Sequence, residues 1–318
     1  MRNKFAETFY ELAKADDRLC AIVADISPAG SIQKFREDFP DRFINTGVAE
    51  QIMIGMAAGM AQRGMNVFCY TIATFALYRS FEFIRDDLAY QNLPVTVVGI
   101  GGGLTYSTLG ATHHAMEDVA VACAIPNMKV IAPCDPLETE AAVRWCAQNK
   151  AGPVYLRLGK AGEPDLTGGL EDSWEFGKIQ YVRKAFSSEG TFCVLSFGPT
   201  VKTALEVADG LIERGHAASV VSISTLKPLD IKGLTSLLNI HSHIVVIEEC
   251  SVPIVAERIL AYGSKYGTSN RIYSFNLHDE FKHVYGSHED LTRAHDFTTK
   301  QILESLDKEI GWNASERV

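Results

Sequence analysis

The sequence lacks the features that would place it in a membrane or on a nucleic acid. No apolar run reaches the ~20 residues needed to cross a bilayer, and residues 1–12 have an amphipathic pattern unlike that of a signal peptide. Lys and Arg form no basic stripe, and the net charge is −9, which gives no support for nucleic-acid binding. We therefore expect a cytoplasmic protein with neither a membrane nor a nucleic-acid partner.

The cysteines lack any pairing pattern. Their number is odd, no CxxC motif occurs, and most of them lie in apolar runs. We expect free, buried thiols in a reducing compartment. The seven positions are Cys20, Cys69, Cys123, Cys134, Cys146, Cys193 and Cys250.

The sequence does contain enough apolar material for two domains. Its 318 residues are 47% hydrophobic and 22% charged, which is typical of globular proteins, and this length favours two domains over one. Short apolar runs alternate with helical patterns, which predicts parallel sheets covered by helices on both faces. The predicted fold class is α/β, with two three-layer domains at 1–165 and 189–318 and a linker at 166–188.

The predicted elements alternate regularly in both halves. In the first half we predict strands at 21–24, 67–70, 95–100, 130–132 and 154–158, and helices at 49–63, 76–89, 113–123 and 137–148. In the second half we predict strands at 192–196, 218–223, 243–248 and 271–275, and helices at 201–214, 231–239 and 252–262.

One predicted helix begins with an acidic residue and is apolar on every face. Residues 47–64 read GVAEQIMIGMAAGMAQRG, and Glu50 lies in the first turn. A helix with this composition should be buried. Glu50 could complement the helix dipole, or it could be a carboxyl group in a dry pocket that shares a proton with a ligand ring nitrogen.

Aromatic residues cluster where the second predicted strand gives way to a helix. Phe75, Tyr78, Phe81 and Phe83 fall within nine residues. Aromatic side chains at such spacing usually belong to a core, and the alternative is a stacking platform for a flat heterocycle.

A glycine-rich loop follows the third predicted strand. Residues 101–114 read GGGLTYSTLGATHH, and ligands of parallel sheets bind at the carboxyl ends of strands. The GxGxxG spacing and the P-loop lysine are absent, so nucleotide binding is not indicated. Of His113 and His114, one should be a surface or capping residue and the other a hydrogen-bonding or proton-transfer group in the cleft. No third ligand has suitable spacing, so we expect no metal site here.

The second half offers no comparable cluster. Glu248 and Glu249 follow a predicted strand, and His283 and His288 lie near the end of the chain. We expect all four to be surface or packing residues.

Taken together, these segments resemble the pyrimidine-binding and carboxyl-terminal domains of transketolase, in the form in which that enzyme is divided between two chains. The resemblance covers essentially the whole chain. The similar segments are the glutamate helix at 47–64, the aromatic pocket at 74–95, the substrate loop and next unit at 101–138, the end of the first domain at 152–160 and the carboxyl-terminal ending at 284–302.

The resemblance implies a thiamine diphosphate-dependent enzyme that transfers a two-carbon ketol unit from a ketose to an aldose. It implies that Glu50 hydrogen-bonds the aminopyrimidine ring and favours the imino tautomer that deprotonates the thiazolium carbon. It further implies that Phe75, Tyr78 and Phe81 lie against the pyrimidine. In the same family pattern Asp25 lies near the thiazolium ring, and His113 contacts substrate oxygens near the reacting carbon.

The chain departs from the family pattern at positions that contact the substrate. Leu109 stands where the family usually has an acid that recognises a sugar hydroxyl, and the place of a phosphate-contacting histidine falls near Gly101. Arg2, Lys160 and Ser27 match other phosphate contacts. The resemblance is therefore compatible with a phosphorylated sugar and with a modified one.

One family motif is absent. The Gly-Asp-Gly motif that holds magnesium and the diphosphate does not occur in this sequence. The resemblance therefore implies an amino-terminal partner subunit that carries the metal ligands, with the cofactor at the interface and two copies of each chain. The chain alone should then be inactive.

Three other functions remain open. The beta subunit of a 2-oxo acid or acetoin dehydrogenase shares the glutamate helix and the domain order, although YQNLPV and GATHHAMED favour transketolase. A 1-deoxyxylulose phosphate synthase-like enzyme is a further alternative, but that enzyme is normally a single chain. The last is a non-catalytic subunit that retains the fold.

Overall fold

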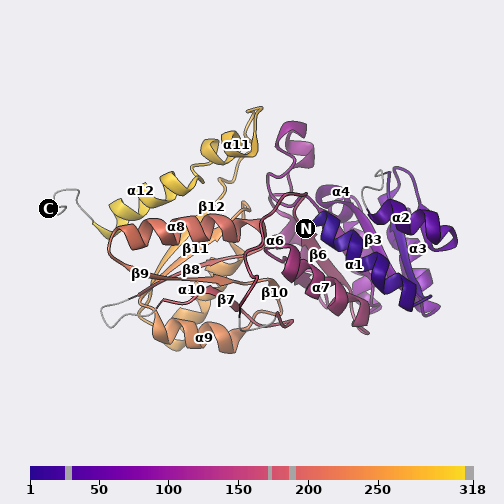
Figure 1. Ribbon diagram of the computed structural model, residues 1–318, viewed down its shortest axis with the longest axis horizontal. Coiled ribbons are helices and arrows are strands. Elements are labelled where there is room, and N and C mark those ends of the chain that lie inside the picture. Colours follow the sequence, from indigo (N-terminus) through magenta and orange to yellow (C-terminus); the bar gives the residue numbers. More distant parts are fainter. Residues whose placement is uncertain (26–30, 171–173, 186–190, 312–318) are drawn as a thin grey trace.

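Two α/β lobes lie side by side in the computed structural model, which describes residues 1–25, 31–170, 174–185 and 191–311 (Figure 1). Each lobe is built on a mostly parallel sheet with helices on both faces. The predicted α/β fold class is therefore confirmed. All seven cysteines are buried and free, as predicted. Among the described residues, none of the helices combines the length and apolar character needed to span a bilayer.

The first sheet has seven strands within the described part of the chain, in the order β10-β5-β6-β4-β3-β1-β2. All neighbouring strands are parallel except β10, which is antiparallel to β5. The strands are β1 (Leu19–Val23), β2 (Phe43–Asn45), β3 (Asn66–Ile72), β4 (Thr96–Ile100), β5 (Lys129–Ile131), β6 (Val154–Leu158) and β10 (Thr225–Lys227).

Alternate side chains of each central strand serve opposite faces of this sheet. In β1, Cys20 and Ile22 pack on one face, and Leu19, Ala21 and Val23 pack on the other. This is why the strands read as continuous apolar runs. One face is covered by α3 (Glu50–Gln62), α4 (Ala73–Leu77), η2 (Ile84–Tyr90) and α6 (Asp118–Ala124), and the other by α1 (Arg2–Ala15), α2 (Ser31–Asp38) and α7 (Pro136–Gln148).

The second sheet has the order β12-β11-β8-β9-β7 among the described residues, with only β7 antiparallel to its neighbour. Its strands are β7 (Gln180–Arg183), β8 (Thr191–Ser196), β9 (Ala217–Ser222), β11 (His243–Glu248) and β12 (Arg271–Asn276). One face carries α8 (Val201–Glu213), α11 (His288–Ala294) and α12 (Thr299–Ile310), and the other carries α9 (Ile231–Ile240) and α10 (Ile254–Tyr266).

The two lobes are joined by more than the connecting chain. Strand β10 lies beyond β9 in the sequence, yet it extends the first sheet, and the Lys227 ammonium group bonds the carbonyls of Cys123 and Ile125. The connecting segment also packs back on the first lobe, because Phe176 stacks on Trp145 with 3.8 Å between ring centroids. Residues 180–183, within the segment that we assign to the linker, form the edge strand β7. The domain limits stay a prediction.

Two predicted helices differ from those observed. The predicted helix 76–89 is divided into α4, a short turn α5 (Phe81–Phe83) and the π-helix η2. The predicted helix 113–123 begins only at Asp118, because residues 107–113 form the 3-10 turns η3 (Ser107–Leu109) and η4 (Ala111–His113) about Gly110, whose φ is 81°. His113 therefore belongs to the loop.

Helix α3 is not buried on every face, so that expectation is wrong for this chain. Met53, Ile54 and Ala57 are buried, whereas Ile52 is 57% exposed and Met56 is 37% exposed. The reason is that the described residues of this chain cover only one side of the helix.

Candidate active site

Four segments that follow neighbouring strands meet at one edge of the first sheet. Asp25 follows β1, Phe75 follows β3, Gly101 follows β4 and Lys160 follows β6. These strands are adjacent and parallel, so their carboxyl ends lie together, where ligands of such sheets bind.

Glu50 is a buried carboxylate at this edge. It is the first residue of α3 and is 3% exposed. Its Oε1 accepts a hydrogen bond of 2.8 Å from Nη1 of Arg79. The Arg79 side chain is 43% exposed, so the partner of this buried acid is itself open to solvent.

Aromatic and imidazole rings continue the site from Arg79. The guanidinium carbon of Arg79 lies 4.1 Å from the centre of the Phe75 ring, a cation–π contact. The His113 ring meets the Phe75 ring edge-on, with 5.1 Å between their centres, and the Tyr106 ring centre lies 6.3 Å from that of His113. Glu50, Arg79, Phe75, His113 and Tyr106 thus form one continuous row.

His113 and His114 lie in different surroundings, and their predicted roles stay a prediction. His114 is 5% exposed, and its Nε2 lies 3.3 Å from the Ser107 carbonyl. His113 is partly exposed, and its Nδ1 lies 2.9 Å from the Thr112 hydroxyl. Burial, followed by the charges of His114 and Arg79, lowers the pKa of His113, which favours a neutral ring at pH 7.

Two cations gather at Tyr106, at the far end of the row. The Lys160 ammonium group lies 5.2 Å from the centre of the Tyr106 ring, and Arg2 lies close enough to oppose the rise that burial causes in the Tyr106 pKa. Nε of Arg2 is buried and has no hydrogen-bond partner in the described part of the chain. The Tyr106 ring packs directly against Gly101, where an added Cβ would lie 2.2 Å from it.

The other predicted site residues have different surroundings. The Tyr78 hydroxyl donates to Glu117 at 2.9 Å, and the Phe81 ring packs on the hydrophobic core beneath α3. Asp25 is exposed with a φ of 43°, and Leu109 is 49% exposed. Ser27 lies outside the described residues.

Sequence reasoning missed Arg79, Tyr106 and the buried network behind the loop. In that network Asp118 accepts hydrogen bonds from Arg157 at 2.9 Å and from Tyr155 at 2.7 Å. Arg79 was visible in the sequence as the one cation inside the aromatic cluster at 74–83. No metal-binding cluster of three or more His, Cys, Asp or Glu side chains occurs in the part of the chain that is described.

Fold and site together define a class: a two-lobed α/β subunit with an acidic and aromatic site at the carboxyl edge of its first sheet. The family described as "Transketolase, pyrimidine binding domain" matches residues 1–162, and "Transketolase, C-terminal domain" matches residues 184–302. The chain belongs to the transketolase family, a family of transferases that depend on thiamine diphosphate.

Similar proteins agree with this assignment. The chain is 33% identical to an apulose-4-phosphate transketolase subunit of Phocaeicola vulgatus, over 79% of this chain and 78% of that protein. It is 33% identical to "Putative transketolase C-terminal section" of Methanocaldococcus jannaschii, over 97% of each. The solved structure titled "Split gene transketolase, inactive beta4 tetramer" has a TM-score of 0.85 and 29% identity, and covers 96% of this chain and 97% of its own.

Proposed function

We propose that this chain is the carboxyl-terminal subunit of a split transketolase that moves a two-carbon ketol unit from a ketose to an aldose. The observation that carries the proposal is Glu50, a buried carboxylate whose partner Arg79 is exposed and lies over the face of Phe75. Such a carboxylate can exchange its partner for a ligand at little structural cost.

The residues present suit the pyrimidine end of thiamine diphosphate. Glu50 offers a carboxylate to a ring nitrogen, and the partly exposed Phe75 ring offers a flat apolar face. Tyr78 and Phe81 would support the pocket from behind, and Asp25 would lie toward the thiazolium. When bound, this cofactor supplies a nucleophilic carbon that carries the two-carbon unit.

The tasks of this chain's own residues follow from their positions. Glu50 would hold and return a proton at the pyrimidine nitrogen, with Arg79 turning from the carboxylate as the ring enters. His113, neutral at pH 7, would hydrogen-bond substrate oxygens near the reacting carbon. Phe75 lies between Arg79 and His113, and so connects the carboxylate's partner to the histidine.

We further propose that the substrates carry an anionic group which Arg2 and Lys160 bind. Both cations lie at Tyr106, and the buried Nε of Arg2 has no hydrogen-bond partner among the described residues. Ser27 would be a further contact. Leu109, exposed and apolar, would alter the choice of sugar at the hydroxyl that the family's acid recognises.

The partner would be an amino-terminal subunit that holds the diphosphate and magnesium. An exposed apolar surface beside Glu50 suits a protein interface: it is formed by Val48, just before α3, and by Ile52 and Met56 on α3. The names of two relatives, one called a transketolase subunit and the other a C-terminal section, support the same division. Two copies of each chain would complete the assembly.

The test is reconstitution with the amino-terminal subunit, thiamine diphosphate and magnesium. The complex is offered a series of ketose phosphates with an aldose acceptor and, separately, pyruvate with an artificial electron acceptor. Ketol transfer supports the proposal. Oxidation of pyruvate without ketol transfer would replace it with the dehydrogenase alternative, and turnover by this chain alone would contradict the need for a partner.

A further inference from the structure

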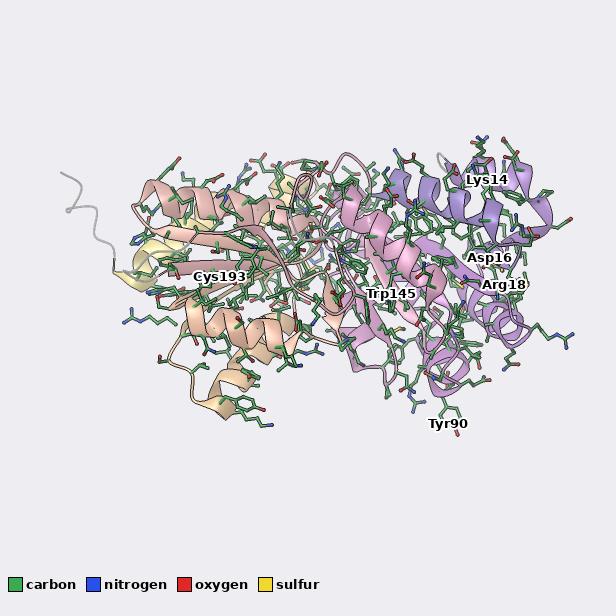
Figure 2. The ribbon with its side chains drawn as sticks, turned by 60° about the horizontal axis from the view of Figure 1, so that its bottom comes forward. Lys14, Asp16, Arg18, Tyr90, Trp145 and Cys193 are labelled. Atoms are coloured by element: carbon green, nitrogen blue, oxygen red, sulfur yellow. The ribbon has the colours of Figure 1, made fainter. Side chains whose placement is uncertain are left out.

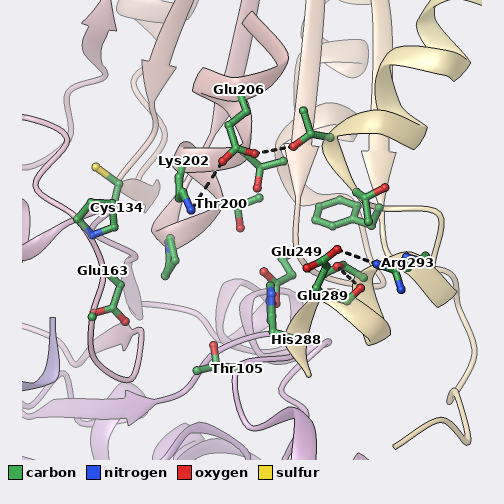
Figure 3. A pocket seen from close by; sticks show the side chains of 18 of the residues that line it. Thr105, Cys134, Glu163, Thr200, Lys202, Glu206, Glu249, His288, Glu289 and Arg293 are labelled. Carbon is green, nitrogen blue, oxygen red and sulfur yellow. Dashed lines mark hydrogen bonds and ion pairs between the residues drawn. The ribbon is translucent and has the colours of Figure 1, made fainter. Parts of the chain in front are cut away.

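The glycine-rich loop that carries His113 is in contact with the second lobe at a cavity of about 700 Å³. Thr105 from the loop lines this cavity together with Glu249 and His288 (Figure 3). Glu249 follows β11, and His288 is the first residue of α11. The contact therefore connects two elements of the second lobe to the loop of the first.

The Glu249 carboxylate sits directly on the loop backbone. It is 7% exposed, and its Oε1 accepts a hydrogen bond of 2.7 Å from the Leu104 N–H. An added Cβ on Gly103, whose φ is +64°, would lie 2.5 Å from the same oxygen. No residue with a side chain could fit here unless the carboxylate moved.

His288 fixes the carboxylate from the other side. Its Nε2 lies 3.0 Å from Oε1 of Glu249, and its side chain is 49% exposed at the cavity. The Glu249 charge raises the pKa of His288 to about 8, so the two form an ion pair at neutral pH.

Other charged groups surround this pair. Arg157 lies behind Glu249, donates to its backbone carbonyl at 3.3 Å and helps to keep the pKa of its carboxyl low. The cavity is also lined by Lys202, Arg293, Glu163, Glu206 and Glu289. Arg293 pairs with Glu289, Lys202 with Glu206, and Glu163 with the amino-terminal ammonium group of Met1, so each of these neighbours has another partner.

The loop is held on the Arg157 side as well. An added Cβ on Gly102 would lie 2.4 Å from Nε of Arg157, which is 2% exposed and bound to Asp118. Gly103 and Ala115 then exchange two backbone hydrogen bonds that close the loop at its base. His113 lies within this closed segment, and so its position depends on how the base is held.

We propose that Glu249 and His288 are positioning residues that hold the 101–115 loop, and through it His113, in the orientation that receives the substrate. The proposal deepens the proposed transketolase function and depends on it only for the effect on catalysis. Glu249 acts through the Leu104 N–H, and His288 acts through Glu249.

The first test is amide hydrogen exchange in the isolated chain. His288→Asn and Glu249→Gln are compared with Lys202→Ala, which lines the same cavity but pairs with Glu206. We expect exchange in peptides spanning 102–115 to rise about tenfold in the first two variants and to stay unchanged in Lys202→Ala. Equal exchange in all folded variants would overturn the proposal. His288 is half exposed, so His288→Asn keeps the test valid if Glu249→Gln fails to fold.

The second test separates positioning from catalysis in the reconstituted complex. We expect His288→Asn to raise the KM for the ketose about tenfold and to lower kcat less. In the unsubstituted complex, His288 loses its charge as the pH rises through about 8. Over that range the protection of the loop amides from hydrogen exchange should fall, and the KM for the ketose should rise. His288→Asn should show neither change. If its pH profile matched that of the unsubstituted complex, the role of His288 would be overturned. If exchange responds but the complex transfers no ketol unit, then the loop contact holds and the proposed function fails.

Discussion

Each lobe buries a glutamate beside the first turn of a helix, and the two glutamates are satisfied in opposite ways. Glu248 is fully buried, and its two oxygens accept three hydrogen bonds from the backbone N–H groups of residues 254–256, at 2.9 to 3.0 Å. Glu50 is almost as buried, yet the described residues give it one hydrogen bond, from the half-exposed Arg79. The first arrangement completes a helix start, and the second leaves an acid available to a ligand.

The apolar surfaces near these glutamates also differ. Helix α10, whose first N–H groups bind Glu248, exposes Leu260 and Tyr266 in its second half, away from that glutamate. Helix α3 instead leaves Ile52 and Met56 open, and Tyr90, at the end of the neighbouring η2, projects from the surface with 86% exposure (Figure 2). The comparison indicates that burial alone does not identify a functional acid. A buried acid is better identified as functional when its partner is exposed to solvent and an uncovered apolar surface lies beside it.

The largest effect should come from removing the exchangeable acid. In the reconstituted complex, Glu50→Gln should lower kcat by about 10²- to 10⁴-fold, because the amide cannot donate or accept the proton. The stability of the isolated chain should change by no more than about 1 kcal/mol, since the Arg79 partner is exposed. Steady-state kinetics and urea unfolding measure the two quantities. Unchanged turnover would support a non-catalytic subunit.

The next effect concerns the uncovered helix face. A charge in the centre of a protein interface is costly, so Ile52→Lys should weaken binding to the amino-terminal partner about 100-fold or more. Ile212→Lys is the matched control, because Ile212 is 46% exposed on α8 of the other lobe. Calorimetric titration with the partner gives both affinities. Equal affinities would mean that α3 is not the docking face.

Substitution of Glu248, whose oxygens accept three backbone hydrogen bonds, should affect stability instead of catalysis. Glu248→Gln offers one acceptor oxygen to three N–H donors, so we expect a loss of about 2–3 kcal/mol in the free energy of unfolding. Urea titration of the isolated chain measures this loss, with Glu50→Gln as the reference. A smaller loss for Glu248→Gln than for Glu50→Gln would reverse the comparison between the two glutamates.

The smallest effect is the pH dependence of the Glu249–His288 ion pair. Its histidine has a pKa of about 8 in the folded chain, above the value of about 6.5 expected for an unfolded chain. The stabilisation is therefore complete below pH 6.5 and is lost as the pH rises through 8. Because His288 is half exposed, we expect a difference of less than about 1 kcal/mol between pH 6 and pH 9. Urea midpoints of the native chain and of His288→Asn should converge at pH 9, and a constant gap would contradict the assignment.

Several parts of the fold follow directly from local sequence patterns. The central strands β3, β4, β6, β8 and β11 are continuous apolar runs, because parallel strands bury both faces. The edge strands β2, β7 and β10 were missed. They have three or four residues and are partly exposed or paired across the chain, so no periodic signal marks them.

The candidate site was predictable in its components but not in its connections. Glu50 stands out as an acid at the start of an apolar helix, and Phe75 and His113 stand out by residue type and by position after predicted strands. Arg79 and Tyr106 become site residues only through contacts between separate segments. Glu249 and His288 resemble ordinary packing residues in the sequence, and their role depends on how the second lobe meets the loop.

The order of residues was enough to specify two α/β lobes and an acid at the start of an apolar helix, because strand and helix periodicities and helix starts are local properties. The packing of distant segments was needed to establish which buried glutamate is satisfied and which is available, which side of α3 remains uncovered, and which histidine faces the aromatic ring. Those properties depend on partners that lie far away in the chain and close in space. Burial and hydrogen-bond saturation are therefore fixed by packing and not by neighbouring residues in the sequence.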